Sequence, residues 1–221
     1  PQSNHVLASD WSSTSAVVVR AGRLSQSALE GVVQTVADLA TLSLRELDLY
    51  GTAVTDRGLV ALSKMSSLES LNLTTSGITD SGLKALANLP RLQHLSVMGV
   101  VGDQGLAALK PVATLRELNV SGSRIGSAEQ LSALTQLSKI SLSESDITDE
   151  GLAKVRRLPG LVGLSLLGCA GVSDDGIRAL RECKHLRQLD VSVTKMTPAT
   201  LEVLRKALPE WDIEHWGIGE R

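Results

Sequence analysis

Apolar residues recur along this chain as one repeated phrase. The phrase starts with Leu-x-x-Leu-x-Leu, passes through a small hydroxyl residue and an Ile or Val, and ends in Thr-Asp-x-Gly-Leu with a short apolar-periodic run. Successive copies start 22 to 25 residues apart, and a fixed period in this range predicts stacked supersecondary units. The seven copies open at Leu44, Leu68, Leu92, Leu115, Leu137, Leu161 and Leu186.

Each copy combines a strand period with a helix period. Leu71 and Leu73 lie two residues apart, so their side chains share one face of a strand while the polar residues around them face the other way. Leu83, Leu86 and Leu89 then recur at helical spacing, and the proline that follows ends this run because it cannot donate to a helix. Each unit is therefore predicted to be one strand and one short helix.

A unit of this size cannot bury its own strand and helix, so neighbouring units are expected to stack and join their leucines into continuous ladders. The strands then form one parallel sheet backed by helices. Because a helix is wider than a strand, the stack curves with its strands on the concave side. The predicted fold class is an α/β solenoid of horseshoe shape. We expect one domain over 1–221, with an N-terminal capping segment at 1–43, seven repeats at 44–210 and a C-terminal cap at 211–221.

Both ends of the stack need covering. An atypical capping repeat is predicted at 14–43, with a strand at 16–19 and a longer helix that contains 29–36. At the other end, residues 211–213 alternate as a short final strand over the open edge. The tryptophans at positions 11, 211 and 216 all lie outside the regular repeats and are interpreted as end plugs. The alternative for Trp216 is a binding anchor.

The stretch from Leu161 to Cys183 resembles the cysteine-containing leucine-rich repeat of F-box substrate receptors. The other copies, with Ile-Thr-Asp-x-Gly-Leu and no cysteine, are similar to related repeats of bacterial proteins, as is the ending Ala-Leu-Pro-x-Trp-x-Ile at 207–213. This resemblance covers about residues 14–215. It implies a leucine-rich repeat solenoid that binds protein, and it carries no catalytic residues. An F-box segment is not found in this sequence.

The fourth repeat departs from the pattern. Residues 125–131 lack Thr-Asp-x-Gly, and the unit has only 22 residues, so its helix is predicted to shrink to one or two turns of 3₁₀ type. The third repeat is one residue short. Together these two repeats either change the curvature of the solenoid or reflect neutral drift in loops that tolerate length changes, and we favour drift.

The sequence offers few candidates for catalytic, metal-binding or disulfide-forming residues. Cys169 and Cys183 fall in a small polar column and an apolar helix column, which predicts buried structural thiols rather than a disulfide or metal site. The repeated aspartates are interpreted as helix caps rather than a calcium ladder: Asp56, Asp80, Asp103, Asp149 and Asp174. The four histidines show no metal spacing, and no serine lies in a nucleophile motif, so neither enzymatic activity nor a cofactor is expected.

Charge and hydropathy argue against some classes of binding partner. The net charge is −2, and neither half is basic enough to suggest nucleic acid or an anionic membrane. No apolar run approaches the roughly 18 residues that a membrane helix requires. Unpaired cysteines favour a reducing compartment such as the cytoplasm, or a bacterial source that includes exported proteins. We expect a monomer.

The strand residues that face the concave side carry the functional hypothesis. Bulky apolar or charged side chains among them are candidate anchors for a protein or peptide: Arg45, Glu46, Tyr50, His94, Met98, Arg116, Glu117, Lys139, Leu167 and Arg187. The sequons at Asn72 and Asn119 fall on the same face and are expected to stay unmodified. The leading prediction is a non-enzymatic interaction module. The alternatives are a recognition domain of a larger enzyme or effector, such as a ubiquitin-ligase receptor, and a self-assembling solenoid.

Overall fold

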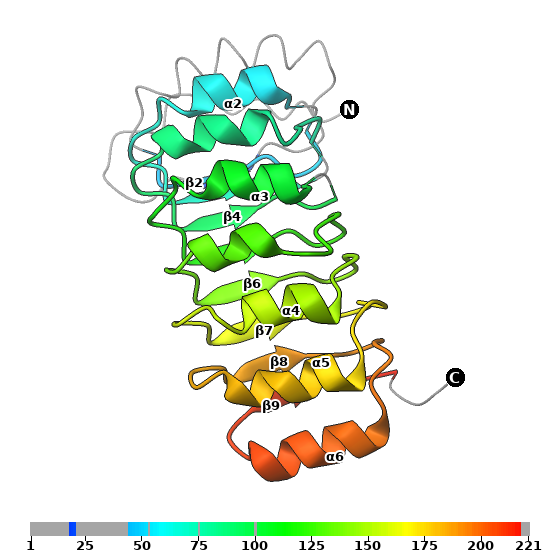
Figure 1. Ribbon diagram of the computed structural model, residues 1–221. Coiled ribbons are helices and arrows are strands. Elements are labelled where there is room, and N and C mark those ends of the chain that lie inside the picture. The colour runs from blue at the N-terminus through cyan, green and yellow to red at the C-terminus, as the bar shows by residue number, and fades with distance from the viewer. Residues whose placement is uncertain (1–17, 21–43, 53, 75, 100, 218–221) are drawn as a thin grey trace.

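The computed structural model describes residues 18–20, 44–52, 54–74, 76–99 and 101–217. Within them, nine three-residue strands form a single parallel sheet in chain order (Figure 1). The strands are β1 Val18–Arg20, β2 Glu46–Asp48, β3 Ser70–Asn72, β4 His94–Ser96, β5 Glu117–Asn119, β6 Lys139–Ser141, β7 Gly163–Ser165, β8 Gln188–Asp190 and β9 Asp212–Glu214. Each strand pairs with the next in the same register, so equivalent residues of successive repeats form straight rows across the sheet.

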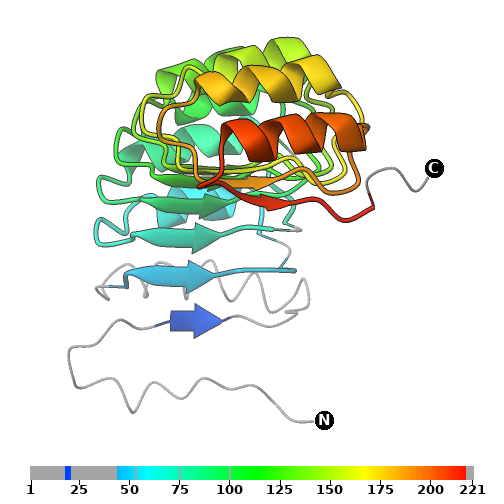
Figure 2. The ribbon, with the colours of Figure 1, turned by 90° about the horizontal axis from the view of Figure 1, so that it is seen from below.

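The helical segments cover one face of this sheet and leave the other face open (Figure 2). They are α2 Asp56–Leu62, η2 Gly82–Asn88, α3 Asp103–Leu109, η3 Glu129–Ala133, α4 Asp149–Val155, α5 Asp174–Ala179, η4 Leu180–Glu182 and α6 Pro198–Ala207. Helices on the convex side and a parallel sheet on the concave side confirm the predicted solenoid. Among the described residues no helix lies over the concave face of the sheet, which is formed by the short strands.

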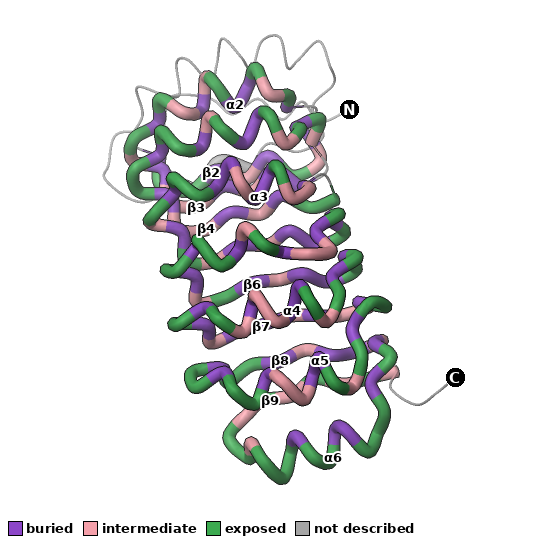
Figure 3. The backbone as a smooth tube through the Cα atoms, viewed as in Figure 1, coloured by how far each residue is buried: buried purple, intermediate pink, exposed green. Residues whose placement is uncertain are grey.

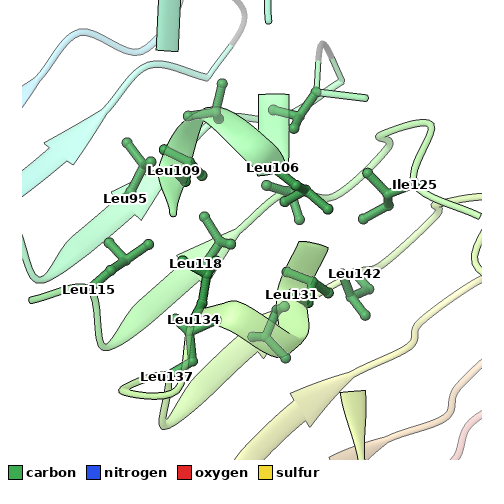
Figure 4. Close-up of a cluster of buried hydrophobic side chains, with 14 of the residues drawn as sticks. Leu95, Leu106, Leu109, Leu115, Leu118, Ile125, Leu131, Leu134, Leu137 and Leu142 are labelled. Carbon is green, nitrogen blue, oxygen red and sulfur yellow. The ribbon is translucent and has the colours of Figure 1, made fainter. Parts of the chain in front are cut away.

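Leucines at the phrase positions form the core between the two layers. In the tube of Figure 3, buried positions repeat in every unit on the inner side of both strand and helix. Figure 4 shows how two neighbouring repeats interlock, with Leu106 and Leu109 of α3 near Leu118 of β5 and Leu131 of η3. These side chains are buried almost completely, and each one contributes roughly 1.5–3 kcal/mol relative to an exposed position.

The structure describes a short strand near each predicted end of the stack. Strands form at 18–20 and at 212–214, each paired in parallel with its neighbour. Trp211 is half-buried against the core, as expected for an end plug, but Trp216 is 66% exposed. The end-plug interpretation of Trp216 is therefore wrong, because its place in the sheet register directs it away from the core. The predicted helix at 29–36 and Trp11 lie outside the described residues.

In two repeats the convex segment is a 3₁₀ helix throughout, and in the sixth repeat the 3₁₀ segment η4 follows α5. In the fourth repeat the 3₁₀ helix is η3, as predicted from its missing motif. In the second repeat η2 is also of 3₁₀ type, although its motif is complete and its leucines predicted the same helix as in the other units. The prolines act as expected, since α6 begins at Pro198 with Thr197 as its cap and η2 ends before Pro90.

The repeated aspartates join neighbouring units and do not cap their own helices. The Asp56 carboxylate accepts the backbone N–H and the hydroxyl of Thr79 in the next repeat, at 2.8 and 2.7 Å. Asp174 binds Thr197 through the same two contacts, and Asp80 accepts the backbone N–H of Gly102. The prediction that these aspartates cap their own helices is wrong, because their carboxylates point along the solenoid, toward the next loop.

The fourth repeat replaces this carboxylate with backbone. It has no aspartate at the equivalent position, and the carbonyl of Gly126 accepts both the N–H and the hydroxyl of Thr148 at 3.2 Å. The loop reaches this position through Ala128, whose φ of 47° is in the left-handed region. The irregular repeat therefore keeps its contact with the fifth repeat by a different chemical group.

Candidate binding surface on the concave face

The rows of equivalent residues divide the concave face into columns that run along the solenoid. From β2 to β9 the first residues of the strands, apart from Gly163, form a charged and polar column, and the last residues form a central polar column. A further column lies two residues beyond each strand. A groove of about 530 Å³ runs over strands β3 to β9 between these columns, with Asn72, Ser96, Asn119, Ser141, Ser165 and Asp190 along its middle.

The floor of this groove is held by a chain of hydroxyl hydrogen bonds that crosses four strands. The chain joins, in order, Asn119, Ser121, Ser141, Ser143, Ser165 and Asp190, with contacts of 2.7 to 3.1 Å. A separate bond of 3.0 Å links Thr74 to Ser96. Because these hydroxyls satisfy one another, the floor is rigid and specificity has to come from the columns on either side.

Both sequon asparagines belong to this floor. The Oδ1 atoms of Asn72 and Asn119 accept the N–H groups of Thr74 and Ser121, each at 3.0 Å. Both side chains therefore lie on the concave face, where the sequence analysis placed them.

The charged column is internally paired at its centre. Glu117 lies between His94 and Lys139, with its carboxylate 3.1 Å from the His94 ring and 3.5 Å from the Lys139 ammonium. Arg45 approaches Glu69 at 3.7 Å. Exposed pairs of this kind contribute about 0–1 kcal/mol, so a partner replaces them at little cost.

The remaining charged candidates differ in whether their side chains already have partners within the protein. Arg187 donates to the backbone carbonyls of Lys184 and Leu186, which holds its guanidinium beside its own loop. Glu46 and Arg116 are exposed, and within the described part of the chain neither takes part in an ion pair. The structure thus brings His94, Glu117 and Lys139 together and leaves Glu46, Arg116 and Arg187 apart from them.

The column beyond the strands contains both buried hydroxyls and partly or largely exposed apolar groups. Thr74, Ser121, Ser143 and Ser192 are buried, while Tyr50 is 58% exposed, Met98 is 38% exposed and Leu167 is half-buried. Trp216 extends this column. Its backbone carbonyl accepts from Val193, as the Thr74 carbonyl accepts from Gly51.

Asp212 and Glu214 of β9 belong to this surface but were not among the predicted site residues, and Trp216, whose alternative interpretation was a binding anchor, continues it. Asp212 falls in the charged column, Glu214 in the central column and Trp216 in the outer column, since β8 pairs Gln188 with Asp212 and Asp190 with Glu214. Residues 211–221 were predicted to form a C-terminal cap. Aligning 211–216 with the strand segment 187–192 as an eighth copy reveals these positions.

The thiols lie away from the groove floor and are buried, as predicted. The Cys169 Sγ donates to the Leu142 carbonyl at 3.1 Å, and burial raises the pKa of this thiol. Cys183 lies on the helical side, where burial raises its pKa to about 11. Across the residues that the structure describes, no cluster of three or more His, Cys, Asp or Glu side chains is arranged to hold a metal ion.

Comparison with known proteins agrees with the fold. A family model described as Leucine Rich repeat matches residues 42–63 and 64–87. An internalin (inlF) from Listeria monocytogenes str. 4b F2365 superposes with a TM-score of 0.61 at 20% identity, over 83% of this chain and 53% of the internalin. A leucine-rich repeat protein of Leptospira interrogans superposes with a TM-score of 0.58 at 20% identity, over 80% of this chain and 45% of the other. No curated protein matches significantly in sequence.

These similarities extend along most of the chain, but the chain spans only about half the length of either solved structure. Among the described helices, none is both long and apolar enough to cross a membrane. The repeated phrase, the single parallel sheet in chain order and the matches to repeat proteins all agree. The chain carries leucine-rich repeats and folds as a leucine-rich repeat solenoid.

Proposed function

We propose that this protein is a non-enzymatic interaction module that holds a protein or peptide partner on its concave sheet. Leucine-rich repeat folds generally serve as protein-interaction modules. The observation that carries the assignment to this face is the outer column, where Tyr50, Met98 and Trp216 expose apolar surface beside a polar groove. Exposed aromatic and Met side chains are typical anchors of protein interfaces.

The groove supports this choice of face over the helical side. Its floor is fixed by the hydroxyl chain, so a partner meets a surface that loses little conformational freedom on binding. On the helical side, large exposed apolar side chains of the described residues are limited to Val60 and Val203, which lie on the distant helices α2 and α6. Single exposed valines of this kind are ordinary for a protein surface.

The test compares two surface variants of equal chemistry. Tyr50→Glu/Met98→Glu places charge on the concave column, and Val60→Glu/Val203→Glu places the same charge on the helical face. Each protein is used for affinity capture from lysate of the source organism, and its thermal stability is measured in parallel. We expect the concave variant to lose the captured protein, the helical variant to retain it, and both to melt close to the wild type.

Two other outcomes count against the proposal. Loss of the partner with the helical variant alone assigns binding to the helices. A large drop in melting temperature for the concave variant shows that Tyr50 and Met98 support the fold instead of a partner.

We further propose that the module is monomeric and works in a reducing compartment. The outer strand β9 carries the exposed charges of Asp212 and Glu214, and charged side chains on an edge strand discourage pairing with a second copy. Cys169 and Cys183 are both free, which suits a reducing environment. Light scattering of the purified chain at several concentrations tests the monomeric state, since a molar mass that rises with protein concentration would contradict it.

A further inference from the structure

We propose that the C-terminal end of the concave groove recognises an Arg or Lys side chain on a segment of a partner protein. The site consists of Asp190, Asp212 and Glu214 in the groove, with the indole of Trp216 beside them. The proposal rests on the function proposed above and names the chemistry of the partner at one end of the same surface.

The sheet register brings the three carboxylates together. Asp190 of β8 pairs with Glu214 of β9, and Asp212 lies two residues before Glu214 on the same face of β9. All three line the groove. The residue between Glu214 and Trp216 confirms the direction, because the ring of His215 accepts a hydrogen bond from Arg205 of α6, on the helical side of the sheet. Glu214 and Trp216 therefore face the concave side.

The charge at this end of the groove is not balanced by the protein. Four of the residues that line the groove carry carboxylates, and Lys139 is the one lysine or arginine among them. Lys139 already contacts Glu117, and Arg187 is held by carbonyls of its own loop. Among the described residues, no ion pair includes Asp190, Asp212 or Glu214. A cationic group from outside complements this charge.

A buried hydroxyl next to the carboxylates is also left without a partner. Thr74, Ser121 and Ser143 each bond to the central side chain of the following strand. Ser192 occupies the equivalent position on β8, so its counterpart is Glu214. Its side chain is fully buried, and its hydroxyl finds no hydrogen-bond partner within the described part of the molecule. A buried hydroxyl without a partner is unfavourable, so this corner of the groove is less completely hydrogen-bonded than the floor over β5 to β8.

Trp216 makes an organic cation a better fit than a metal ion. Trp216 is 66% exposed and follows Glu214 by two residues on the same face of the chain, and an indole face attracts guanidinium and ammonium groups. Half-buried Leu167, in the same column, offers apolar surface to the stem of the side chain or to its neighbour. An Arg or Lys next to an apolar residue satisfies both the charge and the apolar column.

A displayed library of random linear peptides tests the proposal, selected separately against the wild type and four variants. Asp212→Asn/Glu214→Gln removes two charges from the site, and Asp146→Asn/Glu150→Gln removes two exposed charges from a loop and helix start outside the groove. Trp216→Ala removes the indole. Tyr50→Glu/Met98→Glu disrupts the other end of the surface. Affinities of the enriched peptides are then measured at low and high salt.

We expect peptides enriched in Arg or Lys beside an apolar residue. Asp212→Asn/Glu214→Gln should weaken them by about tenfold or more, as should high salt, while Asp146→Asn/Glu150→Gln leaves them unchanged. Trp216→Ala should weaken them by about threefold or more. If binding is lost with Tyr50→Glu/Met98→Glu but is insensitive to Asp212→Asn/Glu214→Gln, this inference is overturned. The proposed binding function of the concave face is then unaffected. Binding that is insensitive to every groove variant overturns both this inference and the proposed binding function of the concave face. Peptides without enrichment in Arg or Lys, or no enriched peptide at all, overturn the inference.

Discussion

The carboxylate of Asp149 occupies the space that a side chain on Gly176 would need. The two residues belong to successive repeats, and a Cβ built on Gly176 would overlap the Asp149 carboxylate. The same relationship joins Asp56 to Gly82 and Asp80 to Gly105. The Asp and the Gly of Thr-Asp-x-Gly therefore belong together across the boundary between units, and this contact explains why the motif contains a glycine.

Gly176→Ala should destabilise the protein by about 2–3 kcal/mol, because the Asp149 carboxylate has to move and lose its bonds to the N–H and hydroxyl of Ser173. Chemical denaturation measures the change. In the background of Asp149→Ala, the same Gly176→Ala substitution should cost much less, since the obstructing carboxylate is gone. Equal costs in both backgrounds would show that the two residues are independent.

Asp174 should make the C-terminal repeats sensitive to acid. Burial raises its pKa, but hydrogen bonds from Thr197 and Thr200 and the charge of Arg178 together lower it below the ordinary value. A lowered folded-state pKa stabilises the protein above the unfolded-state pKa of about 3.9, and this contribution disappears as pH falls through the folded-state value. Asp174→Asn should lower stability near pH 7 and flatten the loss of stability below about pH 4.

The control for this pH experiment is Asp146→Asn, at an exposed aspartate in the loop before α4. Denaturation curves from pH 7 to 2 should coincide in shape for the control and the wild type. An unchanged acid transition in Asp174→Asn would contradict the role assigned to this carboxylate.

Glu144→Gly should raise stability by about 1 kcal/mol. Most repeats place a glycine with positive φ just after the outer column, at Gly51, Gly99, Gly122 and Gly168, but Glu144 adopts a φ of 56° at this position. A residue with a Cβ is strained by roughly 1–2 kcal/mol in the left-handed region, and glycine is not. Calorimetry measures the change, and Gly168→Ala, the opposite substitution in the next repeat, should lower the melting temperature.

Both cysteines should react slowly with thiol reagents in the folded protein. Burial raises the pKa of Cys169 and raises that of Cys183 to about 11, so little thiolate forms near pH 7 and access is poor. A colorimetric thiol reagent should modify both residues quickly in denaturant and neither quickly without it. Rapid reaction of one thiol in native buffer would show that its repeat opens locally.

The architecture of this protein follows from its sequence pattern alone. The period fixes the stack, and the alternation of residues such as Leu71 and Asn72 fixes which side chains enter the core and which face the groove, because both follow from backbone geometry within one repeat. The positions of Tyr50 and Met98 on the exposed face, and the 3₁₀ segment of the fourth repeat, were predictable for the same reason.

The contacts between one repeat and the next could not be predicted from the sequence and are visible only in the folded protein. Within a single copy, Asp149 looks like a helix cap and Trp216 like an end plug, since the partner of each residue lies a full unit away in the chain. The carboxylate instead bonds to Ser173, and the register of β9 turns Trp216 toward the open face. Contacts between units depend on the stacking register and on side-chain direction, and these are set when the strands pair across the sheet.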